Sequence, residues 1–320
     1  MSESRSEPVS AGLKEASSAP WMGPPTEVVG VTRTEGGHRI RRPGGEPLVR
    51  LVNVSKRFGS QHVLRNLSLD ILEGQSTVII GPSGTGKSVL IKHIVGLLTP
   101  DEGEVYYRGE RVDQLDAAEL VEVRKKIGFL FQMAALFDSL NVGDNVAFPL
   151  VEHTDLDKAE RDERVDRVLR MVGLSGLQSQ MPSELSGGQK KRVSLARSIV
   201  LEPEMVLYDE PTTGLDPIRS DLINELIVGL STRLGITSVV VTHDMNSACK
   251  IADRMLLIYD GSIIHDGPPE SFWKSDNELV KRFVHGQADA VDLALIQEGL
   301  DDTEEDERER SVSRDVASGI

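Results

Sequence analysis

The sequence predicts an α/β fold with a mainly parallel sheet, and two patterns in its middle section support this. Short β-branched and aliphatic runs, apolar throughout, alternate with stretches of helical periodicity. Strands that are apolar at every position are typical of a parallel sheet covered on both faces, since neither face meets water. The runs are STVII (76–80), KIGFLF (126–131), MVLYDE (205–210), TSVVVTH (237–243) and RMLLIYDG (254–261).

A mostly helical insert is predicted within this α/β pattern, from about residue 133 to 185. Four of its apolar residues recur at i, i+3, i+4 and i+7, the spacing of one buried helix face. They are Val165, Val168, Leu169 and Val172. Gly173 follows directly, and glycine commonly stands just past the end of a helix. We therefore expect an amphipathic helix that ends at this glycine.

The two ends of the chain differ from this core in composition. Residues 1–47 are rich in Ser, Pro and Gly without sustained periodicity, which predicts a flexible arm. Residues 286–320 hold eleven Asp and Glu against three Arg, which predicts a solvated acidic tail. Residues 48–285 contain no internal repeat, so we expect one cassette between the two ends.

The composition argues against several classes of function. The net charge is −15, and binding to nucleic-acid phosphates needs a basic face, so we expect no nucleic-acid partner. A single cysteine rules out an internal disulfide and is typical of a reducing compartment. No apolar run approaches the roughly 18 to 20 residues needed to span a bilayer, and the start of the chain lacks the apolar block of a secretory signal.

A glycine-rich loop predicts a phosphate site. The string GPSGTGKS (81–88) follows the run STVII and precedes the apolar stretch VLIKHIVGLL. Glycines let backbone amides curl around phosphate oxygens, and a helix start adds roughly half a positive charge. We expect Lys87 to contact the β- and γ-phosphates of a nucleotide and Ser88 to bind Mg²⁺. A glycine turn beside a solvated lysine is the structural alternative.

Two acidic residues end the run MVLYDE. The carboxyl ends of parallel strands are where α/β sheets bind ligands, so Asp209 and Glu210 are candidates for that edge. One carboxylate there can hold Mg²⁺ through water, and its neighbour can orient an attacking water. Taken alone, an acidic pair after a strand is often a helix cap; combined with the phosphate loop it predicts hydrolysis of a nucleotide.

Five motifs in a fixed order resemble those of the ATP-binding cassette (ABC) ATPases. GPSGTGKS is followed by ELSGGQKKR (184–192), YDEP (208–211), GLD (214–216) and VTHD (241–244). The resemblance covers roughly residues 48–285. It implies a P-loop NTPase core with a mainly parallel sheet, an antiparallel β subdomain and an inserted helical subdomain. It also implies that two copies form a head-to-tail homodimer around two molecules of ATP with Mg²⁺.

The resemblance assigns the phosphate contacts residue by residue. The phosphate loop comprises Gly81, Pro82, Ser83, Gly84, Thr85, Gly86, Lys87 and Ser88. The signature comprises Ser186, Gly187, Gly188 and Gln189, and it contacts the γ-phosphate held by the other copy. From the residues themselves, Ser186 is expected to cap a helix whose apolar face buries Val193, Ala196 and Val200, which leaves an anion site without a lysine. Alone, SGG is typical of a linker.

The remaining assignments concern the Mg²⁺ site, the residues of the hydrolytic step, the dimer interface and the contact with adenine. Ser88, Gln132 and Asp209 are implied as the Mg²⁺ site. The implied catalytic set is Glu210 as the carboxylate, His243 as the switch histidine at the γ-phosphate, Gln132 beside the attacking water, and Lys87. Asp216 lies in a loop that crosses the dimer interface, and Phe58 takes the place of the aromatic ring stacked on adenine. A structural histidine at 243 and a core role for Phe58 are the alternatives.

One segment is too apolar for a solvent-exposed loop, and its amino-acid sequence resembles that of a subgroup of the family. FQMAALFDSLNVGDNVAFPL (131–150) is similar to cassettes of Mla/Mce-type lipid transport systems. That resemblance implies two partners: a separate integral-membrane permease that docks near residues 133–150, and a lipid-binding Mce-type subunit. It also implies phospholipid transport and a peripheral location on the cytoplasmic face of the bacterial inner membrane. Met133, Leu136, Phe137 and Phe148 would then form the interface; packing inside the helical insert is the alternative. Gln189 departs from the Met of many members.

Other functions of an ABC ATPase share the same catalytic residues. A non-transport membrane machine that regulates cell-wall or division enzymes, or a transporter for another substrate, would differ only in the docking segment and its partner. Chromosome-handling cassettes place long coiled coils between the phosphate loop and the signature, and translation-factor cassettes carry two cassettes in one chain. Neither arrangement is present in this sequence.

Overall fold

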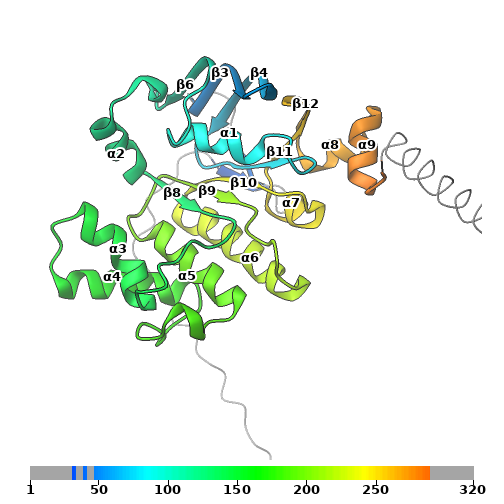
Figure 1. Ribbon diagram of the computed structural model, residues 1–320. Helices are drawn as coiled ribbons and strands as arrows, with labels where there is room; N and C mark the ends of the chain where they lie inside the picture. The colour runs from blue at the N-terminus through cyan, green and yellow to red at the C-terminus, as the bar shows by residue number, and fades with distance from the viewer. Residues whose placement is uncertain (1–30, 34–38, 42–46, 289–320) are drawn as a thin grey trace, which may run out of the picture.

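The computed structural model describes residues 31–33, 39–41 and 47–288, so most of the predicted arm and nearly all of the predicted acidic tail lie outside the described residues. Three sheets are formed. A two-stranded antiparallel ladder pairs β1 (Val31–Arg33) with β2 (Arg39–Arg41), inside the stretch for which the sequence indicated no regular structure. The other two sheets build the body of the molecule (Figure 1).

The larger sheet has six strands in the order β12-β11-β5-β10-β9-β8. The five runs predicted as parallel strands form its five parallel members, and β12 adds an antiparallel edge. The bounds are β5 (Ser76–Ile80), β8 (Ile127–Leu130), β9 (Met205–Asp209), β10 (Thr237–Val241), β11 (Arg254–Tyr259) and β12 (Ser262–Gly267). The predicted parallel sheet is confirmed.

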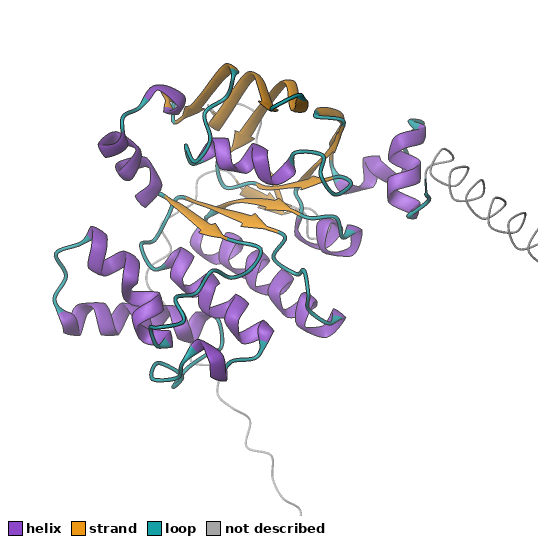
Figure 2. Ribbon diagram, in the orientation of Figure 1, coloured by secondary structure: helices purple, strands orange, loops and turns teal. Residues whose placement is uncertain are grey.

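The smaller sheet is antiparallel, in the order β4-β3-β6-β7, and confirms the expected β subdomain. A long hairpin dominates it. The bounds are β3 (Pro47–Phe58), β4 (Gln61–Leu72), β6 (Glu102–Tyr107) and β7 (Glu110–Arg111), followed by η1 (Val112–Gln114) and α2 (Ala117–Lys125). Figure 2 shows this sheet as a separate layer of strands, with a helix between it and the larger sheet.

Two hydrophobic cores lie on opposite faces of the parallel sheet. Successive residues of β5 point to opposite faces, so Ile79 packs in one core while Val78 and Ile80 pack in the other. The first core contains α1 (Lys87–Ile94) and the antiparallel sheet; the second contains α5 (Gly187–Ile199) and α6 (Pro217–Leu234). Burial on both faces is why these strands are apolar at every position.

The stretch predicted to be mostly helical contains α3 (Val142–His153), α4 (Lys158–Met171) and η2 (Pro182–Glu184). Helix α4 follows the expected pattern. Its four predicted apolar residues are all buried, and Gly173 has a φ of 69°, a left-handed conformation that glycine adopts without steric cost. In Figure 1 these helices lie beyond α5, on the side of the molecule away from the antiparallel sheet.

Of the last three helices, the first packs against β5 and α6, and the second packs on the edge strand β12 and against the third. In chain order they are α7 (Met245–Ile251), α8 (Pro269–Trp273) and α9 (Glu278–His285). Within the described ranges, no helix combines the length and apolar character that crossing a bilayer requires.

Candidate nucleotide site

Four neighbouring parallel strands bring the predicted residues to one edge of the sheet. Strands β5, β10, β9 and β8 are adjacent and parallel, so their carboxyl ends lie side by side. The phosphate loop follows β5, His243 follows β10, Glu210 follows β9, and Gln132 follows β8. Residues up to 162 positions apart in the chain therefore share one site because of strand order.

Two glycines of the phosphate loop meet backbone at distances that exclude a side chain. A Cβ on Gly81 would lie 2.3 Å from the carbonyl oxygen of Ile258, and one on Gly86 would lie 2.7 Å from that of Val63 in β4. Gly86 is also the N-cap of α1, with a φ of 97°. The loop can thus turn tightly between β5 and α1 only with glycine at these positions.

Lys87 lies under the loop. Its ammonium donates to the carbonyl oxygens of Gly81 and Pro82, each at 2.8 Å, so the backbone of the loop encircles it. The side chain is buried, and burial lowers the pKa of the Lys87 ammonium, an effect that the carboxylates of Glu210 and Asp209 partly oppose. A cation held in this way is suited to phosphate oxygens, which supply the negative charge that a buried ammonium needs.

An oxygen-rich pair suited to a hard cation stands next to the loop. The hydroxyl of Ser88 donates to the buried carboxylate of Asp209 at 2.7 Å. Within the described residues, no three His, Cys, Asp or Glu side chains gather as a metal site. Mg²⁺ fits such a sparse donor set, because it keeps several waters and takes one or two carboxylates together with nucleotide phosphates.

Glu210 and His243 form a hydrogen-bonded pair. Nδ1 of His243 lies 3.0 and 2.9 Å from the two carboxylate oxygens of Glu210. Thr213 Oγ1 donates to Oε2 of the same carboxylate at 3.1 Å. An ionised carboxylate only accepts, so Nδ1 carries the proton and Nε2 is left to face other partners. The His243 side chain is 56% exposed, whereas the carboxylate is largely enclosed.

The backbone of Glu210 is left-handed, with a φ of 49°. For a residue with a Cβ this costs about 1 to 2 kcal/mol. Its N–H donates to the carbonyl oxygen of Val241 at 2.9 Å, at the end of the neighbouring strand. This hydrogen bond to the neighbouring strand holds the strained peptide in place. The left-handed conformation directs the Glu210 carboxylate out of the strand and toward His243.

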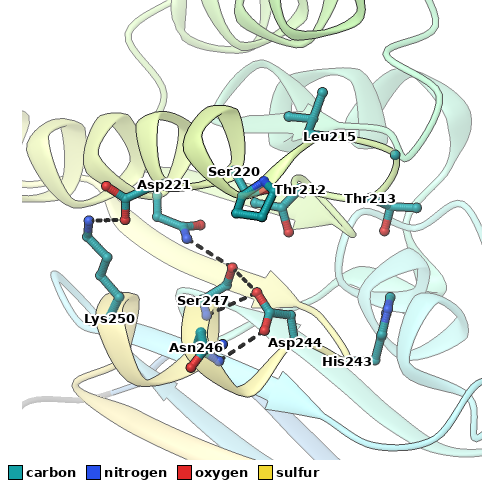
Figure 3. Close-up of a pocket in the computed structure, with 13 residues that line it drawn as sticks. Thr212, Thr213, Leu215, Ser220, Asp221, His243, Asp244, Asn246, Ser247 and Lys250 are labelled. Carbon is teal, nitrogen blue, oxygen red and sulfur yellow. Dashed lines mark hydrogen bonds and ion pairs between the residues drawn. The ribbon is translucent and has the colours of Figure 1, made fainter.

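A structural network supports the turn that carries His243. Figure 3 shows a pocket of about 430 Å³ beside it, lined by the loop after β9 and the start of α7. The carboxylate of Asp244 accepts from the N–H groups of Asn246 (3.0 Å) and Ser247 (3.2 Å) and so caps α7. The Ser247 hydroxyl also accepts from Asn224 Nδ2 of α6 at 2.9 Å, which fixes α7 against α6.

The signature lies at the start of α5, on the far side of the sheet from α1 (Figure 1). Ser186 is the N-cap, as predicted: its Oγ accepts from Gln189 N at 3.4 Å, and Gln189 Oε1 accepts from Ser186 N at 2.8 Å. The predicted buried face is present, with Val193, Ala196 and Val200 all enclosed. The signature lies close to the loop that contains Asp216. A Cβ atom added to Gly187 would lie 3.9 Å from the side chain of Leu215, the residue before Asp216.

Asp216 caps α6 and Phe58 ends β3. Oδ1 of Asp216 accepts from Arg219 N at 3.0 Å. Phe58 is 48% exposed, which does not fit a core role, and the Lys56 ammonium lies 5.7 Å from its ring centroid. The hairpin that carries Phe58 touches the phosphate loop through Val63, so an open aromatic face stands near the nucleotide end of the sheet.

The apolar segment 131–150 is divided between exposed and partly buried side chains. Met133 is 87% exposed, and Phe137 and Phe148 are both partly exposed and pack against each other as tilted rings with centroids 4.8 Å apart. Leu136 instead packs partly buried against the large core. Three of the four residues predicted to form an interface are therefore exposed, and Leu136 is partly buried against the core.

Two cations of α5, one buried and one partly buried, were missed from the sequence. Lys191 donates to the carbonyl oxygens of Gln132 and Glu210, and Arg197 donates to that of Ala134 at 3.0 Å. A signal was present for the lysine: Gly188, Lys191 and Leu195 recur at i, i+3 and i+7, so the lysine lies on the buried face of its helix. Desolvation lowers the pKa of both cations.

Comparisons with known proteins decide the family. Residues 64–213 match the family model described as ABC transporter. The intermembrane phospholipid transport system ATP-binding protein MlaF of Haemophilus influenzae is 42% identical over 242 residues, which cover 76% of this chain and 92% of that protein. This chain belongs to the ABC transporter family. It is an ABC ATPase, which binds and hydrolyses ATP, and the ATPases of this family dimerise and work with a separate permease.

Other ABC proteins similar to this chain carry different names. A "probable ribonucleotide transport ATP-binding protein mkl" of Mycobacterium leprae is 40% identical over 239 residues, covering 75% of this chain and 69% of that protein. A solved dimeric ATP-binding cassette in a post-hydrolysis state, bound to ADP and phosphate, superposes with a TM-score of 0.65 at 37% identity, covering 69% of this chain and 98% of that one. The predicted ABC ATPase fold is confirmed.

Proposed function

We propose that this ABC ATPase drives phospholipid transport by a separate permease, as a peripheral subunit on the cytoplasmic face of a bacterial inner membrane. Two copies dimerise head to tail around two ATP, and an Mce-type lipid-binding subunit completes the complex. The observation that carries the proposal is the exposed apolar surface of the 131–150 segment, which begins beside Gln132 at the nucleotide site. The phospholipid substrate is supported by the name of the relative from Haemophilus influenzae.

The phosphate loop binds the nucleotide in this proposal. Backbone amides of residues 81–88 and the start of α1 face the phosphates, and Lys87 neutralises the β- and γ-phosphate oxygens. Phe58 stacks on the base. Ser88, Asp209 and Gln132 would hold Mg²⁺, which would neutralise charge on the phosphate oxygens.

Glu210 directs the chemical step. A water oxygen bonds to the γ-phosphorus, the bond between that phosphorus and the bridging oxygen breaks, and ADP leaves with the bond's electron pair. Glu210 orients this water and takes its proton; positioning and charge stabilisation supply most of the rate. His243 holds the carboxylate through Nδ1, so Nε2 is free to face the γ-phosphate.

The second copy completes each site. Its signature, Ser186 to Gln189, is an uncharged helix start, and such a start attracts the γ-phosphate of a nucleotide held elsewhere. Asp216 lies in the loop packed beside the signature and crosses the interface. Because each γ-phosphate bridges two chains, hydrolysis removes the bridge and lets the copies separate.

The 131–150 segment and the helical subdomain, about residues 133–185, form the docking surface for the permease. Met133 is flexible and polarisable and adapts to an uneven partner, and the Phe137–Phe148 pair offers a firm apolar surface beside it. Lys191 anchors the start of this segment, at Gln132, to the nucleotide site. Movement of either end is therefore transmitted to the other.

Purification of the intact complex from membranes tests the proposal. We expect the wild-type chain to recover a permease and bound phospholipid, and Met133→Glu to lose the permease by about tenfold or more while still binding ATP, because a carboxylate is desolvated at the interface. Leu97→Glu is the control, since Leu97 is also an exposed apolar residue but lies outside the segment. Equal recovery of the permease by Met133→Glu and wild type would contradict the proposed docking surface.

A ribonucleotide transporter is the second candidate, because the relative from Mycobacterium leprae carries that name. The same purification separates the two. Phospholipid in the recovered complex supports lipid transport, whereas a bound ribonucleotide on the permease, other than ATP or ADP at the cassette, supports the alternative.

A further inference from the structure

A buried lysine stands behind the nucleotide site, and the proposed chemistry does not use it. Lys191 lies in the second turn of α5 and is 6% exposed. Its ammonium donates to the carbonyl oxygen of Gln132 and to that of Glu210, the latter at 3.4 Å. These carbonyls lie just past the ends of β8 and β9, two paired strands. One side chain thus joins the loop that leads to the docking segment with the loop that carries the catalytic carboxylate.

The backbone at both loops needs support. Glu210 is left-handed at a φ of 49°, and so is Ala134, two residues past Gln132, at 61°. Non-glycine residues keep such conformations only where the surroundings hold them. The N–H of Glu210 is held by Val241, and Lys191 holds its carbonyl, so the peptide groups on both sides of this residue are restrained.

Helix α5 links these contacts to the signature. It begins at Ser186, and Lys191 follows within two turns, so both lie on one short, continuous helix. Farther along, Arg197 donates to the carbonyl oxygen of Ala134 at 3.0 Å, and its guanidinium lies 5.7 Å from the centre of the Phe137 ring. A displacement of the signature therefore moves the groups that hold Gln132 and Glu210.

We propose that Lys191 is a positioning residue that fixes the backbones of Gln132 and Glu210 relative to each other, so that engagement of the signature by a partner's nucleotide sets the geometry of the attacking water. Lys191 touches neither the nucleotide nor the water; it acts through the two carbonyls. The inference rests on the proposed roles of Gln132, Glu210 and the signature.

Steady-state kinetics of the full chain test this. Lys191→Met keeps the length of the side chain and removes its three donors, whereas Lys191→Arg keeps a cation with donors. We expect Lys191→Met to lower kcat by about tenfold or more while the KM for ATP stays within about threefold, because the phosphate loop is untouched. Lys191→Arg should recover a large part of the lost kcat. Lys190→Met, next to it and only partly buried, should match wild type.

Three results would overturn the inference: a kcat for Lys191→Met within about twofold of wild type, no recovery by Lys191→Arg, or a rise in KM as large as the fall in kcat. If Lys191→Met does not fold, as judged by its thermal melting, Lys191→Leu, which also lacks a donor, replaces it, and wild-type turnover by that variant has the same meaning. Glu210→Gln is measured in parallel. Full turnover by Glu210→Gln would defeat the proposed catalytic role itself, a failure distinct from that of Lys191.

Discussion

Single side chains set the charge balance behind the phosphate loop. Lys87 and Lys191 are both buried, and so are the carboxylates of Asp209 and Glu210. Desolvation lowers the pKa of each ammonium, while the two carboxylates raise it in part. Burying two charges of each sign together costs far less free energy than burying any one of them alone. Removal of one partner would leave an uncompensated buried charge.

His93 predicts a pH dependence of stability. It is almost fully buried on α1, and its Nδ1 donates to the carbonyl oxygen of Val89 at 2.7 Å. Its buried Nε2 has no hydrogen-bond partner among the residues that the structure describes. Burial lowers the pKa of His93 below its usual 6.5. Below about pH 6.5 the unfolded chain therefore binds a proton that the folded chain does not, and the free energy of unfolding falls as pH decreases.

Urea unfolding at several pH values checks this. Between about pH 7.5 and 5.5 we expect the wild-type midpoint to fall, with a slope from this group of up to about 1.4 kcal/mol per pH unit. His93→Gln should unfold with a smaller pH dependence, because its amide does not titrate. The other histidines are common to both chains and cancel in the comparison. An unchanged pH dependence in His93→Gln would assign the effect to other groups.

At the scale of elements, the loop over residues 131–141 is held by α3, the helix that follows it. Ala134 and Ala135 are both left-handed, with φ of 61° and 48°. Asn145 of α3, which is fully buried, accepts from the N–H of Phe137 at 2.9 Å and donates to the Phe137 carbonyl at 3.0 Å. Its amide also donates to the carbonyls of residues 140 and 141. The segment therefore keeps its apolar side chains at the surface because buried polar groups hold its backbone.

Asn145→Ala tests that support. We expect a loss of about 2 kcal/mol in the free energy of unfolding, because buried donors and acceptors of the segment lose their partner. Asn145→Asp should be at least as destabilising, since it keeps the acceptor for Phe137 but sets a carboxylate against three carbonyl oxygens. Glu152→Ala, exposed on the same helix, is the control and should change little. Denaturant midpoints measure all three, and equal midpoints for Asn145→Ala and the control would contradict the role.

At the scale of the whole molecule, α1, which follows the phosphate loop, and α5, which begins at the signature, lie on opposite faces of the parallel sheet, and we expect a second copy to supply the signature that completes each site. In a head-to-tail dimer each ATP lies between the loop of one copy and the signature of the other. A chain with a defective loop and a chain with a defective signature are then each inactive as homodimers. Their mixed dimer, however, keeps one intact site.

Mixing two variants tests this arrangement. Lys87→Ala and Ser186→Arg should each hydrolyse ATP poorly, and their equimolar mixture should recover up to about a quarter of wild-type turnover, since half of the dimers are mixed and each has one intact site of two. Phosphate release measures the recovery, and a mixture of Lys87→Ala with a Lys87→Ala/Ser186→Arg double variant is the control. Turnover in the first mixture no higher than in its separate components would rule out the shared site.

Local patterns in the sequence were enough for much of this protein. The five parallel strands, helix α4 with its C-terminal glycine, and the helix behind the signature were all predictable, because each depends on periodicity and turn residues within a short stretch. The phosphate loop and the acidic pair after β9 were predictable for the same reason: a strand, its loop and the following helix are contiguous in the chain.

Contacts between distant residues were decided by the tertiary structure alone. Tertiary packing sets the pairing of His243 with Glu210 and the bridge from Lys191 to Gln132. It also exposes Met133 and leaves Leu136 partly buried against the core. The physical reason is strand order. The sequence by itself determined which segments become strands and what each carries at its end, but only the assembled sheet set those ends side by side.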